Sequence, residues 1–179
     1  MSLRIIAGLA KGRALHIPDG VDVRPSTARV REAVFNSLQS FGHLQDAQVL
    51  DLFAGSGALG LEALSRGAAS VVFVESHHRA LETLRANIAL VGYEQRSSVI
   101  AGDAMTEVRK LQSAGSASWF DIALCDPPYG FGEWSLLLAQ LPAQVVVAES
   151  NTSVEVGTDW SILKSARYAG TVVVIAERR

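Results

Sequence analysis

The sequence predicts an α/β fold with a mostly parallel β-sheet and helices on both of its faces. From about residue 47, short apolar runs rich in β-branched residues alternate with helical patterns, which is typical of consecutive βαβ units. Near the C-terminus, two further runs are separated only by Ala169-Gly170, which favours an antiparallel hairpin. Because 179 residues fit one domain with a proper core, we expect one sheet to hold all of these runs.

The apolar runs place the strands, and the patterns between them place the helices. We expect parallel strands at residues 49–53, 71–75, 98–101, 122–126 and 145–149, and an antiparallel pair at 162–168 and 171–176. The intervening helices are expected at residues 58–65, 79–91, 105–111 and 134–141. Gly67 and Gly92 are well placed to end the first two helices, since glycine is common just past a helix C-terminus.

The N-terminal segment differs in composition and predicts a small hairpin followed by a helix. Residues 5–6 and 15–17 suggest two short strands, and Pro18-Asp19-Gly20 is a turn signal. Ser26 or Thr27 can cap the helix, with Arg29 and Arg31 off an apolar stripe whose members are Val30, Val34, Leu38 and Phe41. We therefore divide the chain into an N-terminal extension, residues 1–41, and a main domain, residues 42–179.

The net charge of −2 argues at first against a nucleic-acid partner, but it conceals an asymmetry. Residues 1–31 have a local charge of +4, which leaves −6 on the remainder. The cations of this segment are Arg4, Lys11, Arg13, Arg24, Arg29 and Arg31. Such a cluster is either solvated surface or the electrostatic footprint of a phosphate-binding face.

Composition excludes several classes of protein. One cysteine, Cys125, allows neither an internal disulfide framework nor a cysteine-rich zinc site, and it indicates a buried hydrophobe in a cytoplasmic protein. The N-terminus lacks a signal-peptide core, and no apolar stretch approaches the roughly 18 residues of a membrane span. We expect no metal, because no ligand spacing relates the histidines, which are His16, His43, His77 and His78. The short chain and covered sheet favour a monomer.

A glycine loop closes the first predicted strand and opens the first helix. Gly55, Gly57 and Gly60 fit the pattern G-x-G-x-x-G, and Glu75 ends the next strand 20 residues after Gly55, where a carboxylate can accept from ribose hydroxyls. This combination indicates a nucleoside-containing cofactor. The alternative is a purely structural turn.

Asp51, four residues before the first glycine, separates two candidate cofactors. A carboxylate there would repel a pyrophosphate but favour a cation, and S-adenosylmethionine carries a sulfonium and an ammonium group. After the third strand, Asp103 supplies a carboxylate near the expected adenine, although it could equally cap the following helix. The residues expected to bind the cofactor are Asp51, Phe53, Ala54, Gly55, Ser56, Gly57, Glu75, Ser76, Asp103, Ala104 and Asp126.

The tetrapeptide Asp126-Pro127-Pro128-Tyr129 directly follows an apolar run. Its prolines fix an extended backbone and remove two N–H donors, but their carbonyls remain as acceptors. An acidic side chain, rigid carbonyls and an aromatic ring suit a flat ligand with an amino group, such as a nucleobase. The alternative is that Pro127 and Pro128 simply end the strand.

These blocks, in order on successive strand ends, resemble the Rossmann-like class I S-adenosylmethionine-dependent methyltransferases. The tetrapeptide is similar to the motif of their amino-methylating subset. Residues 4–8, 24–36 and 49–68 further resemble the bacterial 16S ribosomal RNA guanine-N2 methyltransferases, the type whose name carries position 966. The likeness spans nearly the whole chain.

The resemblance implies transfer of a methyl group to N2 of a guanine in 16S rRNA within an assembling 30S subunit, with S-adenosylmethionine as the cofactor. Residues 42–179 would be the catalytic domain, and the basic residues of the extension would contact RNA. Asp126 and the carbonyl of Pro127 would accept hydrogen bonds from the amine, and Tyr129 would stack on a base flipped from its helix.

Other functions remain open at this point. The tetrapeptide is shared by methyltransferases that act on adenine N6 or cytosine N4 of DNA or other RNAs, although the extension is too small for a large target-recognition insert. A nicotinamide-dependent oxidoreductase is disfavoured by Asp51. A non-catalytic RNA-binding module is disfavoured by the intact Gly55, Gly57, Glu75 and Asp126.

Overall fold

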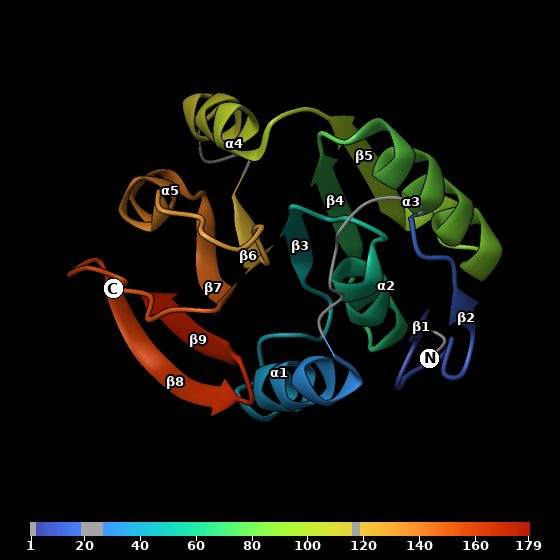
Figure 1. Ribbon diagram of the computed structural model, residues 1–179, viewed down its shortest axis with the longest axis horizontal. Coiled ribbons are helices and arrows are strands. Elements are labelled where there is room, and N and C mark those ends of the chain that lie inside the picture. The colour runs from blue at the N-terminus through green and yellow to red at the C-terminus, as the bar shows by residue number, and fades with distance from the viewer. Residues whose placement is uncertain (1–2, 19–26, 116–118) are drawn as a thin grey trace.

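A computed structural model describes residues 3–18, 27–115 and 119–179. Within them one large sheet runs in the order β5-β4-β3-β6-β7-β9-β8 (Figure 1). Its strands are β3 (Gln48–Leu52), β4 (Ser70–Glu75), β5 (Ser97–Ala101), β6 (Phe120–Cys125), β7 (Ala143–Ser150), β8 (Trp160–Tyr168) and β9 (Thr171–Arg178). Strands β3 to β7 pair in parallel, and β9 is antiparallel to both β7 and β8. This confirms the predicted sheet, with strand ends that differ by at most two residues.

Helices cover both faces of the sheet (Figure 1). One layer holds α1 (Ala28–Ser40), α2 (Ala58–Ser65) and α3 (His78–Val91), and the other holds α4 (Ala104–Ser113) and α5 (Trp134–Gln140). A short 3₁₀ helix, η1 (Glu94–Arg96), leads into β5. The two layers belong to two core clusters, because alternate residues of each strand face opposite sides. The central strands are thus buried on both faces, as their continuous apolar runs predict.

The strand order reverses between β3 and β6, at the centre of the sheet. From β3 the chain moves outward through β4 to β5, and it then returns to β6 on the other side. In open α/β sheets the crevice at such a switch point, beyond the carboxyl ends of the strands, is the usual place for a ligand. The topology alone therefore directs attention to the loops after β3 and β6.

The extension forms the expected hairpin, but its strands are shorter and lie earlier in the sequence. Strand β1 (Leu3–Arg4) pairs antiparallel with β2 (Ala14–Leu15). Residues Ile6 and Ala7 leave the ladder because their N–H groups donate to the carboxylate of Glu62 on α2, at 2.7 and 3.0 Å. The hairpin therefore packs beside α2 and α3 (Figure 1), and it shares their core cluster.

Helix α1 begins as predicted but buries a different set of side chains. Thr27 caps it by accepting from the N–H of Val30 at 3.3 Å, whereas Ser26 lies outside the described residues. The expectation that Phe41 completes the apolar stripe is wrong, because the helix ends before it and its side chain is 40% exposed. The expectation that Arg31 lies off the stripe is also wrong, because Arg31 and Phe35 widen the buried face.

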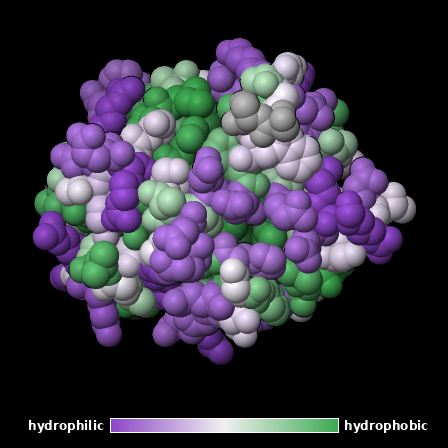
Figure 2. Space-filling model, turned by 180° about the vertical axis from the view of Figure 1, so that it is seen from behind, coloured by the Kyte–Doolittle hydropathy of each residue, from purple (hydrophilic) through white to green (hydrophobic). Residues whose placement is uncertain are grey.

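The face opposite to that of Figure 1 is mostly hydrophilic, with hydrophobic residues in small groups between polar ones (Figure 2). Among the described residues, no helix is long and apolar enough to cross a membrane.

Candidate active site

A cavity of about 750 Å³ lies beyond the carboxyl ends of the central strands. It is lined by the segments that follow β3, β4, β5, β6 and β7, by the turn between β8 and β9, and by the start of α1. Pockets for small ligands commonly measure about 300–1,000 Å³. The cavity therefore occupies the switch point and has room for a nucleoside-sized molecule together with part of a second one.

The glycine loop forms one wall through an unusual backbone. Phe53, Gly55 and Gly57 have φ of 61°, 56° and 80°. A Cβ at residue 57 would lie 2.4 Å from Cδ1 of Leu84 and displace that side chain, and the positive φ makes glycine the residue suited to this position. Phe53 is a non-glycine residue in a sparsely populated region, which is common at functional sites. Its ring meets Phe131 edge-on, with 5.4 Å between the centroids.

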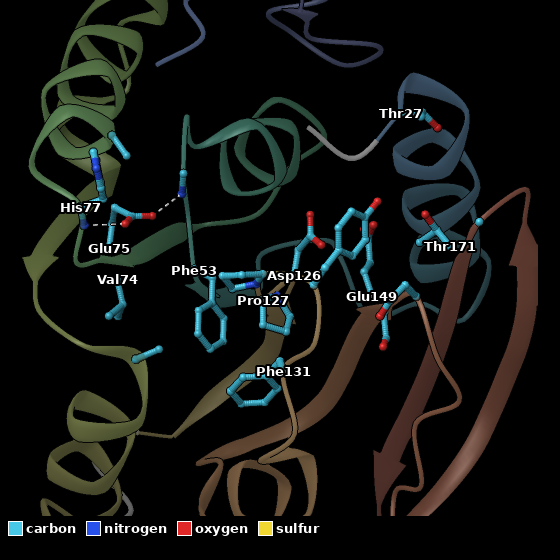
Figure 3. A pocket seen from close by; sticks show the side chains of 18 of the residues that line it. Thr27, Phe53, Val74, Glu75, His77, Asp126, Pro127, Phe131, Glu149 and Thr171 are labelled. Atoms are coloured by element: carbon cyan, nitrogen blue, oxygen red, sulfur yellow. Dashed lines mark hydrogen bonds between the residues drawn. The ribbon is translucent and has the colours of Figure 1, made fainter. Parts of the chain in front are cut away.

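Glu75 ties this loop to the end of β4 (Figure 3). Its Oε2 accepts from the N–H of Gly55 at 2.7 Å, and its Oε1 accepts from the N–H of His77 at 2.7 Å. The carboxylate also lines the cavity. Each oxygen keeps a lone pair for a ligand, so Glu75 can hold the loop and accept from a vicinal diol at once.

Asp51 does not line the cavity, contrary to the expectation that it contacts the cofactor. It is 1% exposed, and its Oδ2 accepts from the N–H of Gly60 at 2.9 Å, behind the loop. Burial raises the pKa of Asp51, the hydrogen bond from Gly60 lowers it, and the charges of Glu75 and Glu149 raise it further. Asp51 thus holds the glycine loop from behind and does not contact the cavity. The other expected cofactor residues that do not line it are Ala54, Ser56 and Gly57.

Asp103 caps a helix, as the sequence allowed, and its position leaves the predicted cofactor contact open. Its Oδ2 caps α4 by accepting from the N–H of Thr106 at 2.8 Å. The residue also lines the cavity, as do Ser76 and Ala104. One carboxylate oxygen is thus used by the helix, and the other is available to a ligand.

The tetrapeptide after β6 lines the cavity with all four of its residues, Asp126, Pro127, Pro128 and Tyr129. The Tyr129 side chain is 63% exposed, so its ring has an open face. Burial raises the pKa of Asp126 well above its ordinary value, and the charges of Glu149 and Asp51 raise it further. The site therefore holds a proton acceptor that is stronger than an ordinary carboxylate.

Several lining residues were missed by the sequence reasoning. Glu149 lies at the end of β7, next to Asp126 (Figure 3), and it is 1% exposed. The sequence could have indicated Glu149, because it is an acidic residue at the carboxyl end of a predicted parallel strand. Arg167 and Tyr168 reach the cavity from the hairpin of β8 and β9, and Asn151 from the segment after β7. No local pattern marks these three residues.

The cations of the extension separate into different places. Arg29 is exposed and lines the cavity, whereas Arg24 lies outside the described residues. Arg31 is 2% exposed, and its Nη2 donates to the carbonyl of Arg4 at 2.9 Å, so it faces the interior and not a phosphate. The cations on the hairpin, exposed but outside the cavity lining, are Arg4, Lys11 and Arg13.

The described residues include no group of three or more His, Cys, Asp or Glu arranged to hold a metal ion. Four acidic residues among those described nevertheless line the cavity: Glu75, Asp103, Asp126 and Glu149. Such an arrangement favours a ligand that brings positive charge and hydrogen-bond donors.

Comparison with known proteins gives a consistent result. The family described as "Conserved hypothetical protein 95" matches residues 3–175. The Bacillus subtilis protein named "Putative rRNA methyltransferase YlbH" is 32% identical over 99% of this chain and all of its own length. The Escherichia coli "Ribosomal RNA small subunit methyltransferase D" is 41% identical over 73% of this chain, in an alignment that spans 62% of that enzyme. The solved structure of "Putative methyltransferase yhhF from Escherichia coli" superposes with a TM-score of 0.82, at 33% identity, over all of this chain and 99% of that one.

Proposed function

The chain belongs to the Conserved hypothetical protein 95 family and is a class I S-adenosylmethionine-dependent methyltransferase, and we propose that it methylates N2 of a guanine in 16S ribosomal RNA. The RNA would be presented in an assembling small subunit. The observation that carries the proposal is the position of Asp126, Pro127 and Tyr129 on the same cavity as the glycine loop and Glu75. The names of the B. subtilis and E. coli relatives support an rRNA substrate.

The half of the cavity formed after β3, β4 and β5 fits the cofactor. Glu75 offers lone pairs to the ribose hydroxyls, and the second oxygen of Asp103 is suited to the adenine end. The field of the surrounding carboxylates favours a ligand with a sulfonium and an ammonium group. When bound there, S-adenosylmethionine supplies an electrophilic methyl group.

The half formed after β6 and β7 would hold the base. The lone pair of an exocyclic amine is delocalised into the ring, so the amine is a poor nucleophile. Asp126 and the carbonyl of Pro127 would accept its two N–H bonds and hold its nitrogen in line for transfer. Because the amine becomes acidic only as it gains the methyl group, Asp126 would first orient it and then accept its proton.

Tyr129 would stack on the base after the base leaves its helix. Base-aromatic stacking is worth about 1–3 kcal/mol, comparable to the few kcal/mol that unstacking costs. A ring that is 63% exposed has an open face for this contact. Arg29 and Arg167 on the rim would hold the flanking phosphates.

The test is to map the nucleotide that the protein labels. Small subunits from a strain that lacks the enzyme are incubated with the protein and radioactive S-adenosylmethionine, and the modified position is identified. We expect N2-methylguanosine in 16S rRNA. A label on adenine N6 or cytosine N4, or no label at all, would refute the proposal.

The variant Asp126→Ala tests the proposed role of Asp126 in methyl transfer. Transfer should fall by at least about 100-fold, the scale of losing a positioned catalytic group, while calorimetry shows that S-adenosylmethionine still binds. The control is Asp159→Ala, an exposed carboxylate beside the opposite end of the sheet, which should keep wild-type activity. Wild-type activity of Asp126→Ala would remove Asp126 from the mechanism.

A further inference from the structure

Glu149 and Asp126 occupy equivalent positions on neighbouring strands. Strands β6 and β7 pair in parallel with Cys125 opposite Ala148, so the next residue on each strand is Asp126 and Glu149. Neighbouring strands lie about 4.8 Å apart. Both residues line the cavity, and Figure 3 shows them beside each other where the strands end.

The Glu149 side chain lies on the face of the sheet that α1, α2 and α3 cover. Leu124 and Val147, two residues earlier on each strand, both pack in the core cluster beneath α1, α2 and α3. Because side chains alternate along a strand, Glu149 continues on that side, toward α1. A base held against Asp126 would therefore meet the Glu149 carboxylate along the same edge.

Arg31 interacts electrostatically with Glu149 in the interior of the protein. Burial lowers the pKa of Arg31, while the charges of Glu62 and Glu149 raise it, so the three groups form a buried electrostatic cluster under α1. Glu62 is already used by the N–H groups of Ile6 and Ala7 and by Nε of Arg66. Glu149 differs from Glu62 because it also faces the cavity.

We propose that Glu149 is the residue that selects guanine, by accepting the ring N1–H while Asp126 and Pro127 hold the N2 amine. The inference rests on the proposed function and specifies how its base is chosen. Guanine presents two adjacent kinds of donor on this edge, N1–H and N2–H₂. Beside their amino groups, adenine and cytosine present a ring-nitrogen lone pair. A carboxylate facing this lone pair could not form a hydrogen bond, because neither group carries a hydrogen to donate.

The probe for this contact is 2-aminopurine, which keeps the 2-amino group of guanine but has a lone pair at N1. Subunits reconstituted with 16S rRNA that carries guanine or 2-aminopurine at the mapped nucleotide are compared by kcat/KM. Wild type should prefer guanine by at least about 100-fold, because sites built to bind an N–H reject an analogue that lacks it. A preference of less than about threefold would overturn the inference and leave the proposed function standing.

The variant Glu149→Gln separates base reading from a structural role. Its amide can accept from guanine or donate to the N1 of 2-aminopurine, so the preference should shrink by at least about tenfold. If Glu149 only partners Arg31, both substrates should suffer equally and the ratio should not change. Asp126→Asn should lower both rates together, because both bases carry the 2-amino group.

The control is Glu155→Gln, an exposed carboxylate that lies outside the cavity lining, which should keep the wild-type preference. If Glu149→Gln does not fold, the wild-type comparison can still overturn the inference, through a preference of less than about threefold. Absence of guanine methylation by the wild type would overturn both the inference and the proposed function.

Discussion

The variant Glu75→Gln tests whether Glu75 binds S-adenosylmethionine in the half of the cavity proposed for the cofactor. The carboxylate accepts two backbone N–H groups at 2.7 Å each, from Gly55 and His77. In the variant, one of these two backbone N–H groups would face the NH₂ group of the glutamine amide, which cannot accept its hydrogen bond. The amide also keeps only one acceptor oxygen for the ribose hydroxyls, and loss of one hydrogen bond to a charged acceptor in the complex costs about 1.5–3 kcal/mol. At about 1.4 kcal/mol per tenfold, S-adenosylmethionine should bind roughly 10- to 150-fold more weakly.

Calorimetric titration of wild type and variant with S-adenosylmethionine measures this loss, and thermal unfolding without ligand confirms that the variant is folded. The matched control is Glu82→Gln on α3, where the side chain is 65% exposed and its nearest partner, His78, is 3.8 Å away. We expect the control to bind within about twofold of wild type, since exposed pairs contribute little. Wild-type affinity in a folded Glu75→Gln protein would refute the assigned role of Glu75.

Three further predictions concern the base contact of Tyr129, the buried carboxyl of Asp51 behind the glycine loop, and RNA binding by surface cations. Tyr129→Phe should methylate like wild type and Tyr129→Ala should lose about 5- to 150-fold in kcat/KM, since stacking needs only the ring; inactivity of the phenylalanine variant would exclude stacking. Because burial raises the folded-state pKa of Asp51, the neutral carboxyl stabilises the fold below an ordinary pKa of about 3.9, and this contribution is lost as pH rises through the raised value. In chemical denaturation, Asp51→Asn should therefore gain stability over wild type as pH rises, and a constant difference across pH would contradict this. Replacing Arg29, Arg167 or Lys11 by Gln should reduce the salt slope of RNA binding by about 0.7–0.9 per lost phosphate contact, and an unchanged slope would mark that residue as solvated surface.

The sheet could be predicted because its signals are local. Each central strand is an apolar run bounded by turn residues, and the loop after β3 needs glycine at residues 55 and 57 for φ values that other residues rarely adopt. The hairpin of the extension was placed less well, since its strand ends are set by Glu62, which is more than 50 residues away in the sequence. Tertiary hydrogen bonds of this kind leave no periodic pattern.

The site could be predicted only where one strand end carries its own signal. Asp126 and Glu75 could be placed at the cavity because motif and strand end coincide. Arg31 was misplaced because the width of a buried helix face depends on what packs against it, and here both the sheet and the hairpin do. Arg167 was missed because its role depends on the hairpin of β8 and β9 folding back over the cavity.

The protonation state of Asp126 depends on what occupies both halves of the cavity, the half proposed for the cofactor and the half proposed for the base. Burial and the charges of Glu149 and Asp51 favour its protonated form, in which one oxygen would donate and not accept. Positive charge in the cofactor half opposes this effect and favours the carboxylate. Asp126 therefore gains its full acceptor capacity when that half is filled, and by linkage an ionised Asp126 strengthens binding there. In the proposed transfer the amine nitrogen would become cationic, and the neighbours that raise the pKa of Asp126 would also make it the better proton acceptor. One buried carboxylate can thus serve first to orient the amine and then to deprotonate it.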